Sequence, residues 1–294
     1  MPDSVLALIG NTPLVKSQRL NTNPNVDVYF KLEGHNPGGS VKDRPAFHMI
    51  KRGIERGDFN ADSKLIEATS GNTGIALAMA AGVYGLDIEL VMPENSTKER
   101  VQTMRAYGAK VTLTPSDIGI EGARDFVMDK VANEGYIMLD QFGNADNWKA
   151  HYLSTGPEIY EATAGKLTHF VSSMGTTGTI TGTGTYLKEQ DDNIKIIGVQ
   201  PKEGSRIPGI RKWSPDYVPG IFDASKVDDI LFVDETEAVA MAKRLAKEEG
   251  IFSGMSSGGA ATVALRLAAQ LDHGVIVSIV CDRGDRYLSA NLFD

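Results

Sequence analysis

The chain has 294 residues, 41% of them hydrophobic, and its 30 Lys and Arg residues against 38 Asp and Glu residues give a net charge of −8. Length and composition predict a compact soluble chain of one large or two modest domains, and they exclude a fibre, a disordered tail and a disulfide-stapled miniprotein. The acidic balance indicates no general attraction to nucleic acid or to anionic membranes, so any bound anion needs a locally built site.

Cysteine usage and the first residues bear on the compartment. The only cysteine, Cys281, cannot form an internal disulfide, and no Cys and His spacing is typical of a structural zinc site. The chain does not start with the basic and apolar segments of a secretory signal, and the apolar window 75–92 is too interrupted to span a bilayer. We therefore expect a cytoplasmic protein without a metal or a membrane segment.

Short β-rich runs alternate with helical segments along the chain, which is the pattern of parallel sheets covered by helices. The β-rich runs span residues 26–32, 64–68, 88–92, 110–114, 136–139, 169–173, 194–200 and 275–281. Between them, the apolar positions 46, 47, 50 and 54 follow helical spacing. Further helices are predicted over 238–250 and 259–271, the second opened by Gly259.

Glycine-rich loops follow several predicted strands, at residues 38–44, 69–74 and 175–179. In open α/β sheets the carboxyl ends of the strands face a crevice, and the helices that follow point N–H groups into it. We therefore predict an α/β fold of two domains, each a mostly parallel twisted sheet covered by helices, with one site in the cleft between them. A smaller, mobile domain is expected over 39–146 and a larger one over 1–38 and 147–294.

The third loop follows an apolar strand and opens a helix, so its N–H groups and hydroxyls suit a phosphate monoester. Its residues are Gly175, Thr176, Thr177, Gly178 and Thr179. A plain turn is an equally good interpretation of this loop taken alone, because short glycine-loop matches are weak. Nucleotide sites are disfavoured, because the GxxxxGK[ST] motif is absent and Leu187 stands where the dinucleotide motif GxGxxG would need its last glycine.

The loop 69–74 crowds uncharged donors around the start of the next helix, from Thr69, Ser70, Asn72 and Thr73. Such donors at the positive end of a helix suit a carboxylate. The alternative is that Ser70 and Thr73 only cap the helix, which is the commoner role of these residue types. Capping needs one hydroxyl, however, and this loop offers several polar side chains.

Lys42 stands at the first turn of the helix that follows the loop 38–44, where the helix dipole and desolvation both disfavour an ammonium group. A neutral amine is what Schiff-base chemistry requires. The alternative is a solvated charge cluster of Lys42, Asp43 and Arg44. Together, a phosphate loop, a carboxylate loop and a lysine suited to an imine describe an amino-acid enzyme that uses pyridoxal 5'-phosphate.

The segment 252–259 offers Ser256 and Ser257 before another helix, where either residue can act as a cap. In a pyridoxal phosphate site, a serine hydroxyl that faces the pyridine nitrogen leaves the ring neutral, a milder electron sink than a ring paired with Asp. His48 and His151 are expected to pack or to form surface hydrogen bonds, because no His pair, carboxylate dyad or Ser/His/Asp set accompanies them.

A set of longer motifs covers nearly the whole chain: GNTPLV, NPGGSVKDR, EATSGNTG, MRAYGA, DQFGN, STGPEI, GTTGTITG, SSGG and CDRGDRYLS. In this order they resemble the fold-type II pyridoxal phosphate enzymes, which share a tryptophan synthase β-like fold, and among them the O-acetylserine sulfhydrylases, or cysteine synthases. The resemblance implies that Lys42 carries the cofactor and that Asn72 bonds its ring oxygen. Residues 175–179 would hold the phosphate, and Ser256 would face the ring nitrogen. The substrate carboxylate would be held by Thr69, Ser70, Thr73 and Gln141.

Ala68, Thr177 and the segment 208–213 resemble the B form of these enzymes, which is associated with a larger, more polar pocket and with thiosulfate as well as sulfide. Arg211 and Cys281 are the candidates for admitting the larger anion. The alternatives are that Arg211 is a surface charge and that Cys281 is a small buried residue at the end of a strand.

The resemblance implies a β-replacement in a homodimer. The reaction would make L-cysteine from O-acetyl-L-serine and sulfide, or S-sulfocysteine from thiosulfate, through an α-aminoacrylate. Within the fold, the alternatives are a serine or threonine dehydratase and a cystathionine β-synthase-like enzyme. From another class, the alternative is a non-catalytic amino-acid or peptide-binding module, and the intact Lys42 argues against it.

Overall fold

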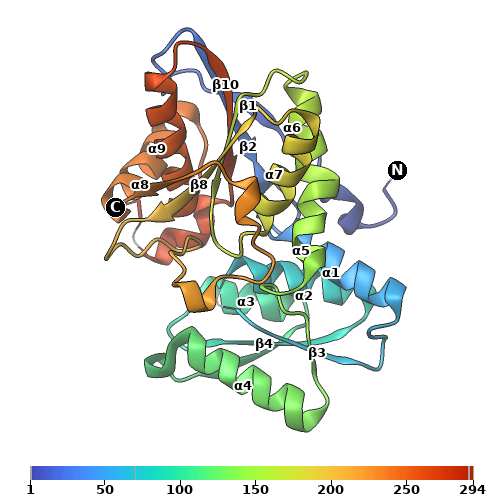
Figure 1. Cartoon of the computed structure of the whole chain (residues 1–294). Helices are drawn as coiled ribbons and strands as arrows, with labels where there is room; N and C mark the ends of the chain where they lie inside the picture. The colour runs from blue at the N-terminus through green and yellow to red at the C-terminus, as the bar shows by residue number, and fades with distance from the viewer. Residues whose placement is uncertain (1, 70, 291, 294) are drawn as a thin grey trace.

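Two β-sheets organise the chain in a computed structural model that describes residues 2–69, 71–290 and 292–293 (Figure 1). The six-stranded sheet has the order β1-β2-β10-β7-β8-β9, and all its pairs are parallel except β1 with β2. Its strands are Leu14–Lys16, Val26–Leu32, Gly274–Val280, His169–Ser173, Lys195–Pro201 and Asp229–Val233. The four-stranded sheet has the parallel order β5-β4-β3-β6, from Lys110–Thr114, Asp87–Pro93, Lys64–Ala68 and Ile137–Met138.

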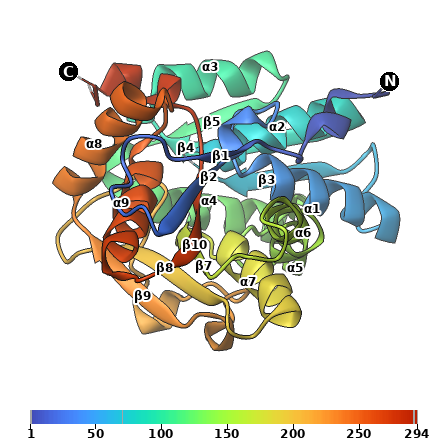
Figure 2. The ribbon, with the colours of Figure 1, turned by 90° about the horizontal axis from the view of Figure 1, so that it is seen from above.

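Helices cover both faces of each sheet, as Figures 1 and 2 show. On the four-stranded sheet, Leu65 packs in the core that includes α1 and α2, while the next residue, Ile66, packs in the core of α4. On the six-stranded sheet, Phe170 packs toward α7 and Val171 toward α9. The bounds are α1 Asp43–Arg56, α2 Asn72–Tyr84, α3 Lys98–Ala106, α4 Gly119–Glu134, α5 Ala145–Ala150, α6 Gly156–Ala162, α7 Gly178–Gln190, α8 Glu235–Arg244 and α9 Met255–Gln270.

The predicted α/β fold with mostly parallel sheets is confirmed, and each predicted β-rich run contains a strand. Strands buried on both faces have continuous apolar sequences, which is why these runs were visible. The short strand β1 and the strand β9 were not predicted. The four-stranded sheet is built from residues 64–138 and so lies inside the expected smaller domain, but the division at 39–146 stays a prediction.

The start of α9 differs from the prediction, because the helix begins at Met255 and Gly259 lies inside it. Its N-cap is Gly254 and receives no side-chain hydrogen bond, so neither Ser256 nor Ser257 caps the helix. The Ser257 hydroxyl instead accepts the N–H of Cys281 at 2.9 Å. The preceding helix, α8, starts at a capping box of Asp234 and Glu237, and the π-helical segment η7 (Leu245–Glu249) continues it from Arg244 to the left-handed Gly250, where the predicted helix ends.

Loops 38–44, 69–74 and 175–179 follow the strands β2, β3 and β7, respectively, in the chain. Loop 69–74 leads from β3 into α2, and loop 175–179 leads from β7 into α7. The fold therefore gathers these loops at strand ends, where parallel α/β sheets bind ligands. No helix in the described part of the chain is long and apolar enough to cross a membrane.

Candidate active site

A cavity of about 1210 Å³ lies among these loops. It is lined by most of the predicted site residues, namely Lys42, Thr69, Asn72, Thr73, Gln141, Gly175, Thr176, Thr177, Thr179, Arg211, Ser256 and Cys281. Gly178 lies in the same loop beside Asn147. Ser70 lies outside the described residues. The structure thus brings residues from both halves of the chain to one cavity.

Lys42 directly precedes α1 and contributes to the cavity wall. Desolvation lowers the pKa of its ammonium group, and the nearby Cys281 and Asp282 oppose that shift without cancelling it. The Lys42 N–H donates to the Ser40 hydroxyl at 3.2 Å, which helps to fix the turn before the helix. A lowered pKa enlarges the neutral fraction of the amine, and this form can act as a nucleophile or a base.

Loop 175–179 presents N–H groups that donate to no acceptor among the described residues. They stand at the start of α7, a helix of 13 residues, where the helix dipole favours an anion. Thr177 adopts a left-handed conformation with φ 70° at the N-cap of this helix. Gly178 leaves room for Asn147, because a β-carbon there would lie 2.0 Å from the Asn147 Oδ1 atom.

The loop before α2 does not use its described hydroxyls as helix caps. The N-cap is Gly71 and has no side-chain cap bond, while the Thr73 hydroxyl donates to Gln141 Oε1 at 2.8 Å. The Gln141 carbonyl in turn accepts from Asn147 Nδ2 at 2.6 Å. The Thr69 hydroxyl accepts the Gly71 N–H at 3.4 Å. Thr73 and Gln141 therefore form one polar wall beside the start of α2.

Glu67 lies behind that wall and is buried. Burial raises the pKa of its carboxyl group to about 8, and Asp140 adds to the rise, against the N–H groups of Gln141, Ala68 and Asp140 that lower it. The neutral form is therefore well populated near pH 7. Its contact with the Gln141 N–H supports the loop that carries the Gln141 side chain, a role that was not predicted from the sequence.

Ser256 and Cys281 form another wall of the cavity. Burial raises the pKa of the Cys281 thiol to about 12, Asp282 adds to the rise, and the Ser256 hydroxyl shares a hydrogen bond with the thiol. The Ser256 carbonyl accepts from the Ser173 hydroxyl at 2.7 Å. The thiol is neutral at physiological pH, so it can border a ligand but is a poor nucleophile.

Arg211 is exposed at the rim, 5.4 Å from the centre of the Trp213 ring. The Trp213 indole N–H donates to the Gly175 carbonyl at 2.8 Å, and the Arg211 N–H donates to the Met174 carbonyl at 2.9 Å. This rim segment is therefore fixed to the end of β7. Arg211 is therefore exposed and also lines the cavity, with its main chain fixed by this segment, and its contact with an incoming anion stays a prediction.

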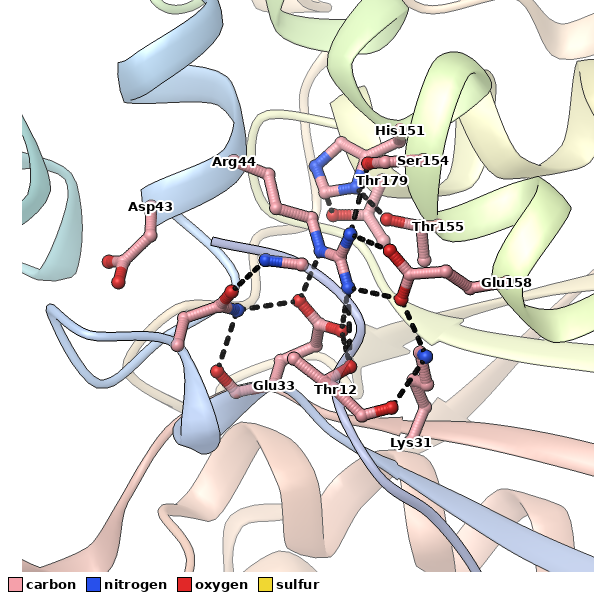
Figure 3. A network of polar contacts seen from close by, with 12 residues as sticks. Thr12, Lys31, Glu33, Asp43, Arg44, His151, Ser154, Thr155, Glu158 and Thr179 are labelled. Carbon is pink, nitrogen blue, oxygen red and sulfur yellow. Dashed lines mark hydrogen bonds and ion pairs between the residues drawn. The ribbon is translucent and has the colours of Figure 1, made fainter. Parts of the chain in front are cut away.

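A buried ionic cluster next to Lys42 was not predicted. Figure 3 shows Arg44 between two carboxylates: it donates to Glu33 at 2.7 and 2.8 Å and to Glu158 at 2.6 and 2.8 Å. Lys31 pairs with Glu158 at 2.7 Å. These four residues are called the Arg44 cluster below. Charged residues inside and directly after the apolar run 26–32 were the available sequence signal.

His151 is buried and lies beside this cluster (Figure 3), with its ring nitrogens 2.9 Å from Thr155 Oγ1 and 3.3 Å from Thr179 Oγ1. Burial, together with Arg44 and Lys42, holds the pKa of His151 well below its usual value. A neutral imidazole in such a position supports the loop at Thr179 through packing and hydrogen bonding.

Comparison with known proteins places the chain in a family. The family model "Pyridoxal-phosphate dependent enzyme" matches residues 5–282. The chain is 56% identical to "Cysteine synthase B" of Pseudomonas aeruginosa, over 97% of this chain and 96% of that protein. The chain belongs to the cysteine synthase family. Its cofactor is accordingly pyridoxal phosphate, which confirms the resemblance stated above.

Solved structures show how widely the fold of this family is used. The cysteine synthase of Entamoeba histolytica is 37% identical with a TM-score of 0.94, covering 100% of this chain and 91% of that one. An O-ureido-L-serine synthase is equally similar, at 37% identity and a TM-score of 0.94, covering 100% of this chain and 96% of that one. The fold alone therefore does not choose the incoming group.

The cavity fits the cofactor of the family by its donor set. Unsatisfied N–H groups and threonine hydroxyls at the start of α7 match a phosphate, and Lys42 offers an amine of lowered pKa for the aldehyde. Asn72 and Ser256 line the same cavity and would contact the ring. The assignment of each of these residues to one atom of the cofactor stays a prediction.

Proposed function

We propose that the chain catalyses β-replacement on O-acetyl-L-serine, making L-cysteine with sulfide or S-sulfocysteine with thiosulfate. Acetate leaves the β-carbon and a sulfur atom takes its place. The observation that carries the proposal is the cavity itself, which is lined by Lys42, by a loop whose N–H groups have no described acceptor and by hydroxyls at the start of α2. The names of the relatives support the choice of substrates.

Lys42 has two tasks in this proposal. Pyridoxal phosphate, when bound, withdraws electrons from the α-carbon of an amino acid attached to it. Lys42 would hold the cofactor before the substrate arrives, and its free amine would then take the proton from the α-carbon. Desolvation favours the neutral amine that this transfer requires. Ser256 would face the ring nitrogen as an uncharged partner, which would keep the electron withdrawal moderate.

The substrate carboxylate would be held at the start of α2. Thr69 and Thr73 supply hydroxyls there, Ser70 belongs to the same loop by sequence, and Gln141 supplies its amide. Because the Thr73 hydroxyl donates to Gln141 Oε1, the Gln141 amide nitrogen stays available as a donor. Helix-start N–H groups and neutral donors hold a carboxylate without a salt bridge.

Arg211 and Cys281 would shape the place of the sulfur donor. Arg211 contributes a positive charge at the rim, and Cys281 contributes a neutral, polarisable thiol on the cavity wall. A doubly charged anion such as thiosulfate gains more from that charge than hydrogen sulfide does. We further propose a cytoplasmic homodimer in which residues 39–146 move toward the substrate, as the family resemblance implies.

The visible spectrum of the purified protein tests the proposal directly. We expect a visible absorption band of the bound cofactor that changes when O-acetylserine is added and returns when sulfide or thiosulfate follows. Lys42→Ala is expected to lower cysteine formation by about 10²–10⁴-fold, since a general base is removed. The matched control is Lys51→Ala, on the exposed side of the same helix, which should retain the wild-type rate.

Product analysis separates this function from its alternatives. Mass spectrometry should find cysteine with sulfide and S-sulfocysteine with thiosulfate. Pyruvate as the main product in the presence of either donor would instead indicate a dehydratase. A wild-type protein that takes up no cofactor and gives no band would leave only the amino-acid binding module.

A further inference from the structure

The 3-10 helix η8 (Gly284–Ala290) lies against the start of α2 and contacts Asn72 there. Asn72 Nδ2 donates to Asp282 Oδ2 at 2.7 Å. Asn72 Oδ1 accepts from Arg286 Nη1 at 2.5 Å. Because a carboxylate only accepts and a guanidinium only donates, only one of the two orientations of the Asn72 amide satisfies both contacts.

Asp282 is itself fixed in place and is only 1% exposed. Its Oδ2 accepts from the Tyr287 hydroxyl at 2.6 Å, and its Oδ1 accepts from the Gly254 N–H at 3.3 Å. Gly254 makes room for this arrangement, because a β-carbon there would lie 2.7 Å from Asp282 Oδ1 and 2.4 Å from the Tyr287 ring. The Asp282 carboxylate is therefore a rigid acceptor.

Arg286 also reaches the loop that leads to Lys42. Its second terminal nitrogen donates to the Gly38 carbonyl, and the Gly38 N–H donates to Asp43 at 2.5 Å. One guanidinium group thus joins the loop before α1 to the first residue of α2. Lys42 and Asn72 lie on these two elements, although they are far apart in the sequence.

We propose that Asp282 and Arg286 are positioning residues that hold the Asn72 amide with its nitrogen toward the cofactor ring. The proposal rests on the proposed function, in which Asn72 contacts the ring oxygen. An amide nitrogen carries two hydrogens, and Asp282 takes one, so the other is free for a ligand in the cavity. A rotated amide would present its oxygen to the ring oxygen, and two acceptors repel each other.

A double-mutant cycle tests the coupling with two readouts, the dissociation constant of pyridoxal phosphate from the apo-protein and the pH midpoint of the visible spectrum. Asn72→Ala and Arg286→Met should each weaken cofactor binding roughly tenfold, the effect of losing a hydrogen bond to a charged group. The double variant should be weakened by clearly less than the product of the two single effects, because one part of the Arg286 effect passes through Asn72 and the other through the Gly38 carbonyl. Arg286→Lys should restore part of the affinity.

Arg283→Met is the matched control, since Arg283 lies close by in the chain and, among the described residues, its side chain pairs only with the exposed Asp285. It should leave both readouts at wild-type values. Arg286→Met with wild-type affinity and spectrum would overturn the proposal, and so would single effects that multiply in the double variant. Should Arg286→Met fail to fold, as judged by circular dichroism, Asp282→Asn enters the same cycle with the same expectation.

The outcomes remain distinguishable from those of the proposed function. A wild-type protein that binds no pyridoxal phosphate overturns the proposed function. A wild-type protein that binds it, combined with independent effects at positions 72 and 286, overturns only the positioning role.

Discussion

The Arg44 cluster and the loop 175–179 flank the same site, but they differ in whether their polar groups have partners within the protein. In the cluster, two cations and two carboxylates pair with one another. The side chains of Arg44 and Glu33 are at most 1% exposed. In the loop, the N–H groups at the start of α7 have no described protein acceptor. Both regions lie within the same fold, and only the second is left chemically incomplete.

This difference distinguishes a region that stabilises the fold, the Arg44 cluster, from a region that can bind a ligand, the loop 175–179. Burial on its own would raise the pKa of Glu158, but the hydrogen bonds and charges of Arg44 and Lys31 lower it to about 2, so the pair stays ionised. A complete cluster of this kind fixes β2, α1 and α6 relative to one another. An incomplete set of donors at a helix start gains its partner only when an anion arrives.

The largest expected effect comes from removing the centre of the cluster. Arg44→Met leaves Glu33 and Glu158 without their main partner in a buried site, so the free energy of unfolding should fall by about 3–5 kcal/mol. Urea denaturation of the apo-protein measures this change in the free energy of unfolding. Arg52→Met, which removes the exposed pair with Glu55, should cost less than about 1 kcal/mol. Equal losses of unfolding free energy in the two variants would show that the Arg44 cluster stabilises the fold no more than an exposed ion pair does.

A second prediction uses Asp43, a buried carboxylate next to the cluster that does not share its pairing. Burial raises the pKa of Asp43 to about 7, although the Gly38 N–H lowers it, and Asp43 Oδ1 has no hydrogen-bond partner among the residues that the structure describes. Arg286, Glu33 and Arg44 are the charged groups that act on it. The folded state therefore keeps a proton on Asp43 that the unfolded state releases above about pH 4.

It follows that the contribution of Asp43 to stability is fully present below about pH 4 and is lost as the pH rises to about 7. Asp43→Asn does not titrate, so its stability relative to wild type should rise across this window by about 2–4 kcal/mol and level off above it. Glu158→Gln should behave in the opposite way, because the pKa of Glu158 is lowered: its stability deficit should shrink as the pH falls toward about 2. Parallel pH profiles for the two variants would contradict the comparison.

The features that could be predicted from the sequence are those formed by residues that lie close together in the chain. The strands were visible because apolar β-rich runs are continuous, and the loops 69–74 and 175–179 were visible because their glycines and hydroxyls are neighbours in the chain. Arg44 and Glu158, by contrast, are 114 residues apart, and Asn72 and Asp282 are 210 residues apart. Such pairs are created by the fold. Neither residue of such a pair has a property in the sequence that indicates its partner.

The backbone conformation of Thr177 could not be predicted from the sequence either, and its variants are expected to show the smallest change in stability. Thr177 adopts φ 70° at the cavity, a region that β-branched residues rarely occupy and that costs a non-glycine residue about 1–2 kcal/mol. Thr177→Ala and Thr177→Gly both remove the hydroxyl bond to the Thr176 carbonyl, so their difference isolates the backbone. The Gly variant should be more stable than the Ala variant by about 1 kcal/mol.

Thr163 provides the matched comparison, because it is also buried and also donates to a nearby carbonyl, but has φ −90°. There the order should reverse, with Ala more stable than Gly by about 0.5–1 kcal/mol. Thermal unfolding of the four apo-proteins measures both differences. If Ala is favoured at both positions, the loop 175–179 carries no backbone strain, and its contrast with the Arg44 cluster reduces to missing hydrogen-bond partners.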